Sequence, residues 1–419
     1  MRRAAVIETR AIPQRDIGIF SALKFHDFRL LWIGLLISNL GTWMQFTAIG
    51  YVIAQAAGSP AQAAVELGYV GAARAAAVLL LSPLAGVVAD RAPRRFVLIC
   101  ANIAMSVAAL LFAVLSSLHA LVLPALVAIS ALNSGAQSFD SPARQSWLPL
   151  LVDRAFIGNA IGLNSVAFNA PAVIGPALAG LLIAWIGVSV SFYINAVATL
   201  AVVVVVFFMR PAPPSVTKRE PLLRSMRAGL VFLLEHPILR WILIAFFVTA
   251  VLARPYSSLA PAFVVNVLHA GPRGLGLAYA AIGIGGLIGA FIVAYAAGRE
   301  RRSVLWVSAG VAMTGGIAAI GLATNLQGAI VCFLIAGTGT LAFLGASNTL
   351  IQTLAPDELR GRAVSVYTMI ALGIVPLGTL IVGALAAHIG LHLAFGILGL
   401  ASAALIAGIF LFVPVVRTV

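Results

Sequence analysis

The feature that most constrains this chain is the length of its stretches without a charged residue. A helix needs about 20 apolar residues to cross a bilayer, and most of these stretches are long enough for two helices. Of the 419 residues, 62% are hydrophobic and only 9% are charged, which excludes a single water-soluble globular domain. The sequence therefore predicts a polytopic membrane protein. The uncharged stretches are residues 30–65, 96–139, 155–209, 303–356 and 363–416.

Turn-forming or interfacial residues divide the long stretches near their middles, as Trp185-Ile186-Gly187 and His388-Ile389-Gly390 do. A boundary at each such point predicts twelve transmembrane helices. Cys100 and Cys332 each lie inside an apolar block, so we expect two buried thiols and no disulfide. The predicted spans are residues 30–54, 66–89, 96–117, 120–139, 158–184, 189–209, 240–265, 274–297, 303–324, 328–350, 362–386 and 391–415.

Most of the 26 Lys and Arg residues lie at alternate helix ends, in the N-terminal arm or in the linker after the sixth span. Lys and Arg in short loops stay on the cytoplasmic side, so we expect an inner-membrane protein with both termini in the cytoplasm. The predicted parts are a cytoplasmic arm (1–29), a six-helix bundle (30–209), an amphipathic linker on the cytoplasmic surface (210–239), and a second six-helix bundle with a short tail (240–419).

The two predicted bundles share sequence features. In each half the loop after the second span is the most basic one, Asp90-Arg91-Ala92-Pro93-Arg94-Arg95 in the first and Gly298-Arg299-Glu300-Arg301-Arg302 in the second. The fifth spans also correspond, AGLLIAWIG (179–187) against VGALAAHIG (382–390). Such a repeat indicates a duplicated six-helix unit, and folds of this kind bind substrate near the bilayer midplane between the halves.

The segment GVVADRAPRR (86–95) resembles the signature that transporters of the major facilitator superfamily carry between their second and third helices, with Pro93 where a second Gly is usual. The resemblance implies that Gly86 allows close helix contact and that Asp90 lies at the positive N-terminus of the span that begins near Arg362. It also implies a gate at the cytoplasmic end. An ordinary basic cytoplasmic loop is the alternative. The candidate gate residues are Gly86, Asp90, Arg91, Arg94, Arg95, Asp140, Arg144, Arg360 and Arg362.

The fifth span resembles a second signature, one associated with exporters of the same superfamily. Small residues at this spacing let helices approach closely, and proline bends the helix. Two of the usual glycines are replaced, by Pro171 and Ala179, so a simple packing face is the alternative. The candidate residues of this motif are Gly162, Pro171, Gly175, Pro176 and Gly180.

Three further stretches, Phe25 to Gln45, Phe139 to Val152 and Asn348 to Tyr367, are similar to the superfamily branch of transmembrane secretion effectors that contains the enterobactin exporter and related drug-efflux proteins. Together with the spans, this resemblance covers nearly the whole chain. It implies the major facilitator fold, with two pseudo-symmetric bundles. It also implies export of a siderophore or an amphipathic drug-like compound by proton antiport. We expect a monomer in the lipid bilayer.

Ionisable groups deep in a span are candidates for function because their burial is costly. Arg74 lies in the second span and Arg254 in the seventh, beside Tyr256. If the two arginines face a central cavity, they favour an anionic or polyphenolic ligand; otherwise they bond to helix carbonyls or extend to the outer surface.

Polar residues at helical spacing mark two further spans. Asn39, Thr42 and Gln45 form a stripe on the first, and Asn133 and Gln137 form a pair on the fourth. They predict either substrate contacts or hydrogen bonds between helices. Asp140 is the best candidate for proton coupling because Arg144 follows one helical turn later, although a gate ion pair with Arg144 or Arg91 explains it equally well.

Other classes of protein fit the sequence less well. An uptake transporter of the same fold is the main alternative. A membrane-embedded enzyme needs a cluster of catalytic groups, whereas the six histidines are scattered. No charged filter of an ion channel appears. The net charge of +14 is distributed between apolar blocks and does not form the basic patch of a nucleic-acid binder. We expect no cofactor and no metal.

Overall fold

The structure, a computed structural model of the 419-residue chain, describes residues 18, 20–209, 222–296 and 302–417. The side chains of residues 89–91, 146, 149, 222–225 and 372 lie outside this description. Within the described ranges every regular element is a helix, so the predicted all-helical class is confirmed.

The first half of the chain forms six long helices. Each begins or ends where the sequence supplies a helix-terminating signal. At Ser59, for example, the side chain accepts a hydrogen bond of 3.1 Å from the backbone N–H of Gln62, and Pro60 is the first helical residue. The helices are α1 (His26–Ala56), α2 (Pro60–Arg91), α3 (Arg94–Ser117), α4 (Leu123–Trp147), α5 (Ile157–Trp185) and α6 (Ser189–Phe208), with short 3₁₀ turns η1 (Ser21–Lys24), η2 (Leu148–Leu150) and η3 (Arg154–Phe156).

The second half repeats this arrangement with two interrupted helices. The seventh predicted span consists of α8, α9 and the π-helical segment η4, and the eleventh consists of α13, the π-helical segment η5 and α14. The elements are α7 (Leu222–Glu235), α8 (Leu239–Leu252), α9 (Tyr256–Pro261), η4 (Ala262–Val267), α10 (Gly271–Ala296), α11 (Arg302–Ile320), α12 (Leu326–Leu354), α13 (Asp357–Met369), η5 (Ile370–Ile374), α14 (Val375–Ile389), α15 (Leu391–Phe412) and α16 (Pro414–Arg417).

Nine helical segments of the described chain are long and apolar enough to cross a membrane. The predicted spans 30–54, 120–139 and 362–386 are also helical, but they are not among those nine. The count of twelve spans therefore stays a prediction.

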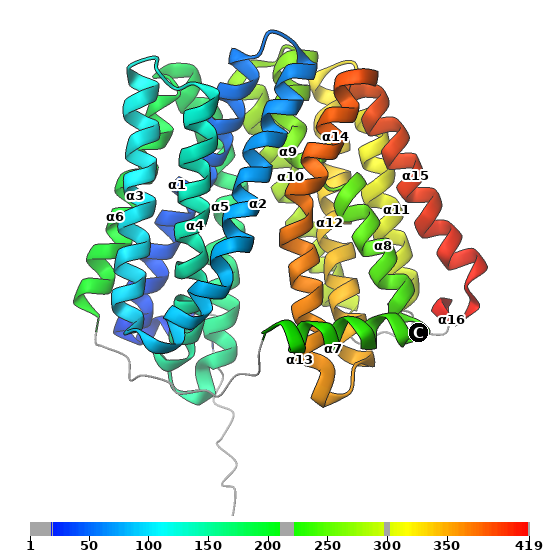
Figure 1. Cartoon of the computed structure of the whole chain (residues 1–419), viewed down its shortest axis with the longest axis horizontal. Coiled ribbons are helices and arrows are strands. Elements are labelled where there is room, and N and C mark those ends of the chain that lie inside the picture. The colour runs from blue at the N-terminus through cyan, green and yellow to red at the C-terminus, as the bar shows by residue number, and fades with distance from the viewer. Residues whose placement is uncertain (1–17, 19, 210–221, 297–301, 418–419) are drawn as a thin grey trace, which may run out of the picture.

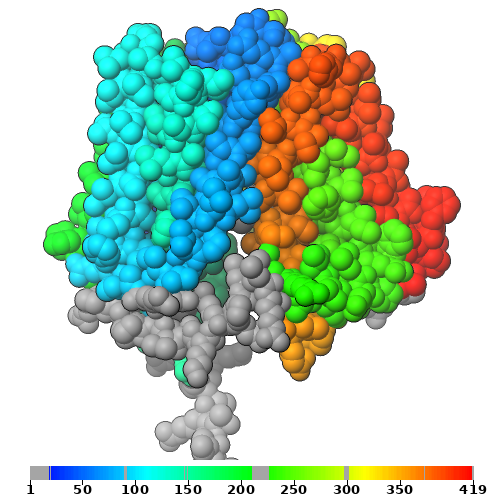
Figure 2. Space-filling view, viewed as in Figure 1, coloured from blue at the N-terminus to red at the C-terminus, as the bar shows by residue number. Residues whose placement is uncertain are grey.

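Two groups of helices, α1–α6 and α8–α15, lie side by side with α7 across one end of the second group (Figure 1). Between the groups, α2 packs on α14 and α5 packs on α10. We call the end that carries α7 the linker end and the other end the far end. In Figure 2 the surfaces of α2 and α14 meet along the seam that leads to the far end.

The two groups approach each other most closely at the far end, where glycines bring backbones together. A Cβ added at Gly383 would lie 2.5 Å from the carbonyl oxygen of Ala64, and one added at Gly180 would lie 2.5 Å from that of Pro272. By contrast, a Cβ at Gly86 or Gly361, both near the linker end, would meet no atom within 4 Å. The groups therefore touch at the far end, and Gly86 does not make the close helix contact that the sequence predicted.

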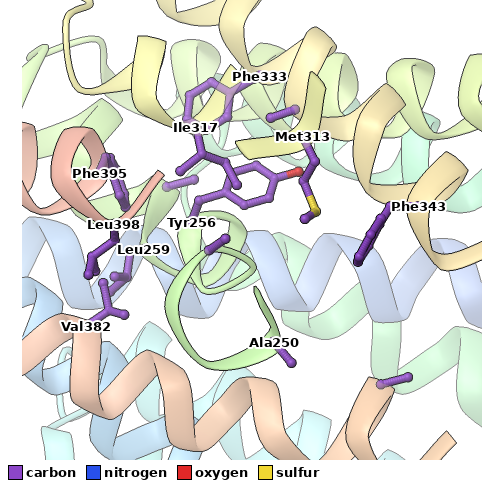
Figure 3. Packing of buried hydrophobic residues seen from close by; sticks show 14 of the residues in the cluster. Ala250, Tyr256, Leu259, Met313, Ile317, Phe333, Phe343, Val382, Phe395 and Leu398 are labelled. Atoms are coloured by element: carbon purple, nitrogen blue, oxygen red, sulfur yellow. The ribbon is translucent and has the colours of Figure 1, made fainter. Parts of the chain in front are cut away.

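The second group holds a dense aromatic core around Tyr256, which is 2% exposed. Figure 3 shows the Tyr256 ring beside Ile317, Met313 and Phe333. The rings of Tyr256 and Phe333 stack with their centroids 6.2 Å apart. The prediction of a buried Cys100 is wrong, because its side chain is exposed on α3, while Cys332 is half-buried.

Candidate functional site

A cavity of about 190 Å³ lies within the first helical group, among α1, α2, α3 and α4. Its lining combines aromatic or aliphatic side chains with polar ones, and the one charged residue among them is Arg74. Its composition, apolar with a few polar groups, is that of a small-molecule site, and its volume is smaller than the roughly 300–1,000 Å³ of most ligand pockets. The lining residues are Thr42, Trp43, Gln45, Phe46, Ile49, Arg74, Phe112, Ser130 and Asn133.

Arg74 is held by contacts with two side chains. Its Nε donates a hydrogen bond of 3.1 Å to the Ser134 hydroxyl, and its guanidinium carbon lies 5.7 Å from the centroid of the Phe46 ring. The Phe46 ring in turn packs on Tyr279 of α10, with centroids 5.5 Å apart. The Phe46 ring therefore links Arg74 to α10 of the second helical group.

Two polar atoms of the cavity wall are buried without a hydrogen-bond partner among the described residues, Ser130 Oγ and Asn133 Oδ1. Buried polar atoms are almost always paired. Both atoms belong to residues that line the cavity beside Arg74, so they mark the most polar part of its surroundings.

The predicted polar stripe of the first span divides between two roles. Thr42 and Gln45 line the cavity, and Asn195 of α6 donates a hydrogen bond of 2.8 Å to Gln45 Oε1. Asn39 instead donates to the backbone carbonyl of Ala167 on α5 at 2.9 Å, which is a contact between helices. On α4, Asn133 lines the cavity but Gln137 is exposed and does not.

Arg254 lies in the turn between α8 and α9, within the second group. Its Nη1 is buried without a hydrogen-bond partner, and its guanidinium carbon is 6.0 Å from the centroid of the Phe246 ring. The neighbouring hydroxyls are used elsewhere, because the Tyr256 hydroxyl pairs with Thr340 at 3.4 Å and Tyr367 donates to the Leu344 carbonyl at 3.0 Å. Neither Arg254 nor Tyr256 lines the cavity of Arg74.

Asp140 forms a buried polar cluster near the linker end of α4. Its Oδ2 accepts a hydrogen bond of 3.1 Å from Arg144 Nε, and its Oδ1 accepts one of 2.8 Å from Asn102 Nδ2. Asp140 is 7% exposed and Arg144 is 8% exposed. The guanidinium of Arg144 also lies over the Phe168 ring of α5, at 4.6 Å, so the cluster joins three helices.

The remaining candidate gate residues belong to two segments, 86–95 and 360–362. The side chains of Asp90 and Arg91 lie outside the described residues. Arg94 is 9% exposed, and Arg95 donates a hydrogen bond to the Phe207 carbonyl of α6. Arg360 pairs with Asp357 at 2.7 Å.

Arg362 is the gate candidate that contacts the linker helix. Its backbone carbonyl lies 2.5 Å from where a Cβ on Gly229 of α7 would stand, so α7 packs directly on α13. A larger residue than glycine would separate the two helices at this point.

The candidate exporter motif of α5 packs on two different helices. A Cβ at Gly175 would lie 2.8 Å from the Trp43 side chain of α1. The Pro176 carbonyl lies 2.7 Å from where a Cβ on Gly276 of α10 would stand, and Gly180 faces α10 as well. Pro171 is buried within α5, whereas a Cβ at Gly162 would meet nothing within 4 Å.

Several residues of these sites had no distinctive signal in the sequence. Trp43, Phe46 and Phe112 of the cavity wall, and Tyr279 across from it, read as ordinary aromatic residues of apolar helices. Asn102 was a lone amide in the third span. Asn102 and Asp140 are 38 residues apart in the sequence, so no local pattern predicts that they pair. The packing of α3 on α4 brings them together.

The chain matches the family model described as transmembrane secretion effector over residues 17–418. The multidrug efflux pump Tap of Mycobacterium tuberculosis is 30% identical over 382 residues, which cover 87% of this chain and 88% of the relative. Tap of Mycolicibacterium fortuitum is 28% identical over 380 residues, covering 87% and 90%. The enterobactin exporter EntS of Citrobacter koseri is 27% identical over 353 residues, covering 83% and 82%.

Solved structures with the same fold include the nucleoside transporter NupG, with a TM-score of 0.72 and 13% identity over 92% of this chain and 98% of that one. A bacterial homologue of the lysosomal transporter Spinster gives a TM-score of 0.69 at 18% identity, covering 94% and 96%. At these identities the likeness concerns the fold alone.

Proposed function

This chain belongs to the transmembrane secretion effector family of major facilitator transporters, and from that premise we propose that it exports an amphipathic small molecule by alternating access. The observation that carries the proposal is the cavity beside Arg74, because its aromatic and polar lining residues suit a ligand with both apolar and polar parts. The relatives named as a multidrug efflux pump and as an enterobactin exporter support the direction.

The arrangement of the two helical groups supports a transport cycle. They touch at the far end through Gly180, Gly276 and Gly383 and have open space around Gly86 and Gly361 at the linker end. If the basic linker end faces the cytoplasm, as the distribution of Lys and Arg favours, this is the state that loads substrate from the cell interior. Rocking of the groups about the central region would then expose the substrate to the opposite side.

We also propose that protons drive export through the cluster around Asp140. A buried carboxylate whose cationic partner moves during the cycle binds a proton more readily when the partner leaves. Asn102, which bonds Asp140, lies on α3, and Phe168, which lies against the Arg144 guanidinium, is on α5, so movement of either helix relative to α4 would change this environment. Proton release to the cytoplasm would follow when the pair re-forms.

Everted inner-membrane vesicles from cells that lack major efflux pumps test the proposal. Three fluorescent probes of one skeleton serve as candidate substrates: dansyl sulfonate, which is anionic, dansylamide, which is neutral, and dansylcadaverine, which is cationic. We expect vesicles that contain the chain to accumulate at least one probe when their interior is acidified, and to release it when nigericin is added.

Vesicles without the chain are the control. Accumulation in right-side-out vesicles instead of everted ones would support the uptake transporter. No gradient-dependent movement of any probe in either orientation would contradict transport of amphipathic aromatic molecules altogether.

A further inference from the structure

Two arginines inside the helical bundle have no carboxylate partner among the residues that the structure describes. The ion pairs between described residues involve His26 with Asp27, Arg144 with Asp140, and Arg360 with Asp357, and none includes Arg74 or Arg254. Glu66, on the same helix as Arg74, instead accepts a hydrogen bond of 2.8 Å from Gln62. The Asp90 side chain lies outside the description, but it is separated from Arg74 by 16 residues of α2, or roughly 24 Å along a helix.

Arg74 has hydrogen-bonding capacity to spare. A guanidinium carries five N–H donors, and the only hydrogen bond of Arg74 found among the described residues is that of Nε with Ser134. Its guanidinium carbon lies 5.7 Å from the centroid of the Phe46 ring, and Arg74 is one of the residues that line the cavity. Paired N–H donors in this planar geometry match a carboxylate, sulfonate or phosphate group.

The rest of the cavity wall suits the body of such a ligand. Trp43, Phe46 and Phe112 offer aromatic surface, while Ser130 and Asn133 hold the unpaired polar atoms. No acidic residue lines the cavity. A cationic ligand would therefore meet a fixed like charge with nothing to offset it, and a neutral ligand would leave the guanidinium uncompensated in a medium of low dielectric constant.

Arg254 adds a second positive charge from the other helical group. Its Nη1 is buried without a partner, and both neighbouring tyrosine hydroxyls are bonded to other groups. Charges in a bundle of low dielectric constant are screened weakly, so each arginine adds to a positive potential in the interior. The interior of the helical bundle therefore favours the binding of an anion.

We infer that the transported molecule is an amphipathic organic anion whose acidic group binds Arg74 while its apolar body lies against the aromatic residues that line the cavity. Arg254 raises the affinity through its field and not by contact. This inference rests on the proposed export function, whose substrate class it names.

Binding of the three dansyl probes to the purified full-length chain tests the inference. Energy transfer from tryptophan to dansyl reports binding, because Trp43 lines the cavity. We expect dansyl sulfonate to bind at least about tenfold more tightly than dansylamide, and dansylcadaverine to bind most weakly. Arg74→Gln should weaken sulfonate binding roughly 10- to 100-fold and keep or slightly strengthen dansylamide binding, because the uncompensated charge is removed. Arg254→Gln should weaken sulfonate binding by a smaller factor.

The matched control is Arg240→Gln, which removes the same charge from an exposed position on α8. It should leave all three affinities unchanged. Intact dansylamide binding shows that a variant is folded, and Arg74→Lys should keep part of the preference for the anion.

Equal affinity for all three probes, or an unchanged sulfonate affinity in Arg74→Gln, would overturn the inference. The vesicle experiment separates this failure from failure of the proposed function. Gradient-driven movement of dansylcadaverine without movement of the sulfonate would leave export standing and contradict the anionic substrate.

Discussion

Asp140 is the candidate residue whose hydrogen-bond partners the structure defines most completely. Both of its oxygens accept hydrogen bonds, from Arg144 at 3.1 Å and from Asn102 at 2.8 Å, and all three side chains are buried. A buried ion pair is weak support for stability, but removal of one partner leaves an uncompensated charge. The same residues could therefore serve structure alone, or structure and proton coupling together.

Asp140→Asn separates these roles only in combination with a second change. The single substitution leaves the Arg144 charge unpaired, and we expect a loss of about 3 kcal/mol of stability, seen as faster thermal inactivation of the purified protein. Proton-driven export of dansyl sulfonate should be lost as well.

The double variant Asp140→Leu with Arg144→Met replaces the pair by apolar groups of similar size, which typically restores stability. If this variant is stable yet transports only down a substrate gradient, Asp140 carries the coupling. Normal proton-dependent export by the double variant would refute that role and leave the pair as a structural contact.

At the residue level the sequence predicted the kind of side chain better than its direction. Helical spacing placed Asn39, Thr42 and Gln45 on one stripe of α1, but that stripe is wide enough to touch both α5 and the cavity, so Asn39 bonds to Ala167 and the other two face inward. In a membrane helix both lipid-facing and core-facing positions are apolar. For this reason burial could not be predicted for Cys100, which is exposed.

Among the elements, α5 connects the cavity to the closed far end. Gly175 packs on Trp43, a residue of the cavity wall, and Gly180 packs on the backbone of α10 near Pro272 and Gly276. Glycines allow backbones to approach closely where no larger side chain fits. Closure of the far end therefore depends on the absence of side chains on this face of α5.

Gly180→Val should favour the state in which the far end is open. A Cβ at this position would lie 2.5 Å from the Pro272 carbonyl oxygen, so the contact between α5 and α10 cannot form as it does here. Spin labels attached at the exposed residues Gln62 of α2 and His388 of α14 should lie farther apart than in the unchanged protein, as measured by pulsed electron paramagnetic resonance. Export should be reduced as well.

Gly162→Val is the matched control. Gly162 lies on the same helix, and a Cβ there would meet no atom within 4 Å. It should leave the label distance unchanged. An unchanged distance in Gly180→Val as well would show that the α5–α10 contact does not determine closure.

The positions of the helices followed from the sequence, but the interruptions in two of them did not. The sequence predicts one helix over residues 240–265, whereas α8 ends at Leu252 and a new helix starts after Pro255. Proline lacks the N–H that would continue the ladder of hydrogen bonds. The π-helical segments η4 and η5 depend on packing against other helices, and no local pattern in the sequence predicts them.

At the scale of the whole molecule, the sequence predicted two halves but not which end closes. Closure follows from contacts between residues far apart in sequence, such as Ala64 with Gly383 and Gly180 with Gly276. Both ends of the helices carry small residues, so composition does not distinguish them. The fold and the family could be predicted, whereas the state of the transport cycle required the packing of the two helical groups.

The charge of the substrate determines how the whole transporter responds to the membrane potential. If a monovalent anion leaves while one proton enters, two positive charges move inward in each cycle, and an interior-negative potential of 100 mV contributes about 4.6 kcal/mol to export. We therefore expect proteoliposomes to move dansyl sulfonate toward the positive side when a potassium gradient and valinomycin set the potential, even without a pH gradient. Transport of a neutral molecule against one proton would move only one charge, so dansylamide should respond about half as strongly per cycle.

If a pH gradient drives sulfonate transport and a potential of either sign leaves it unchanged, the cycle is electroneutral. Proton antiport of an anion, which moves net charge in every cycle, would then be excluded.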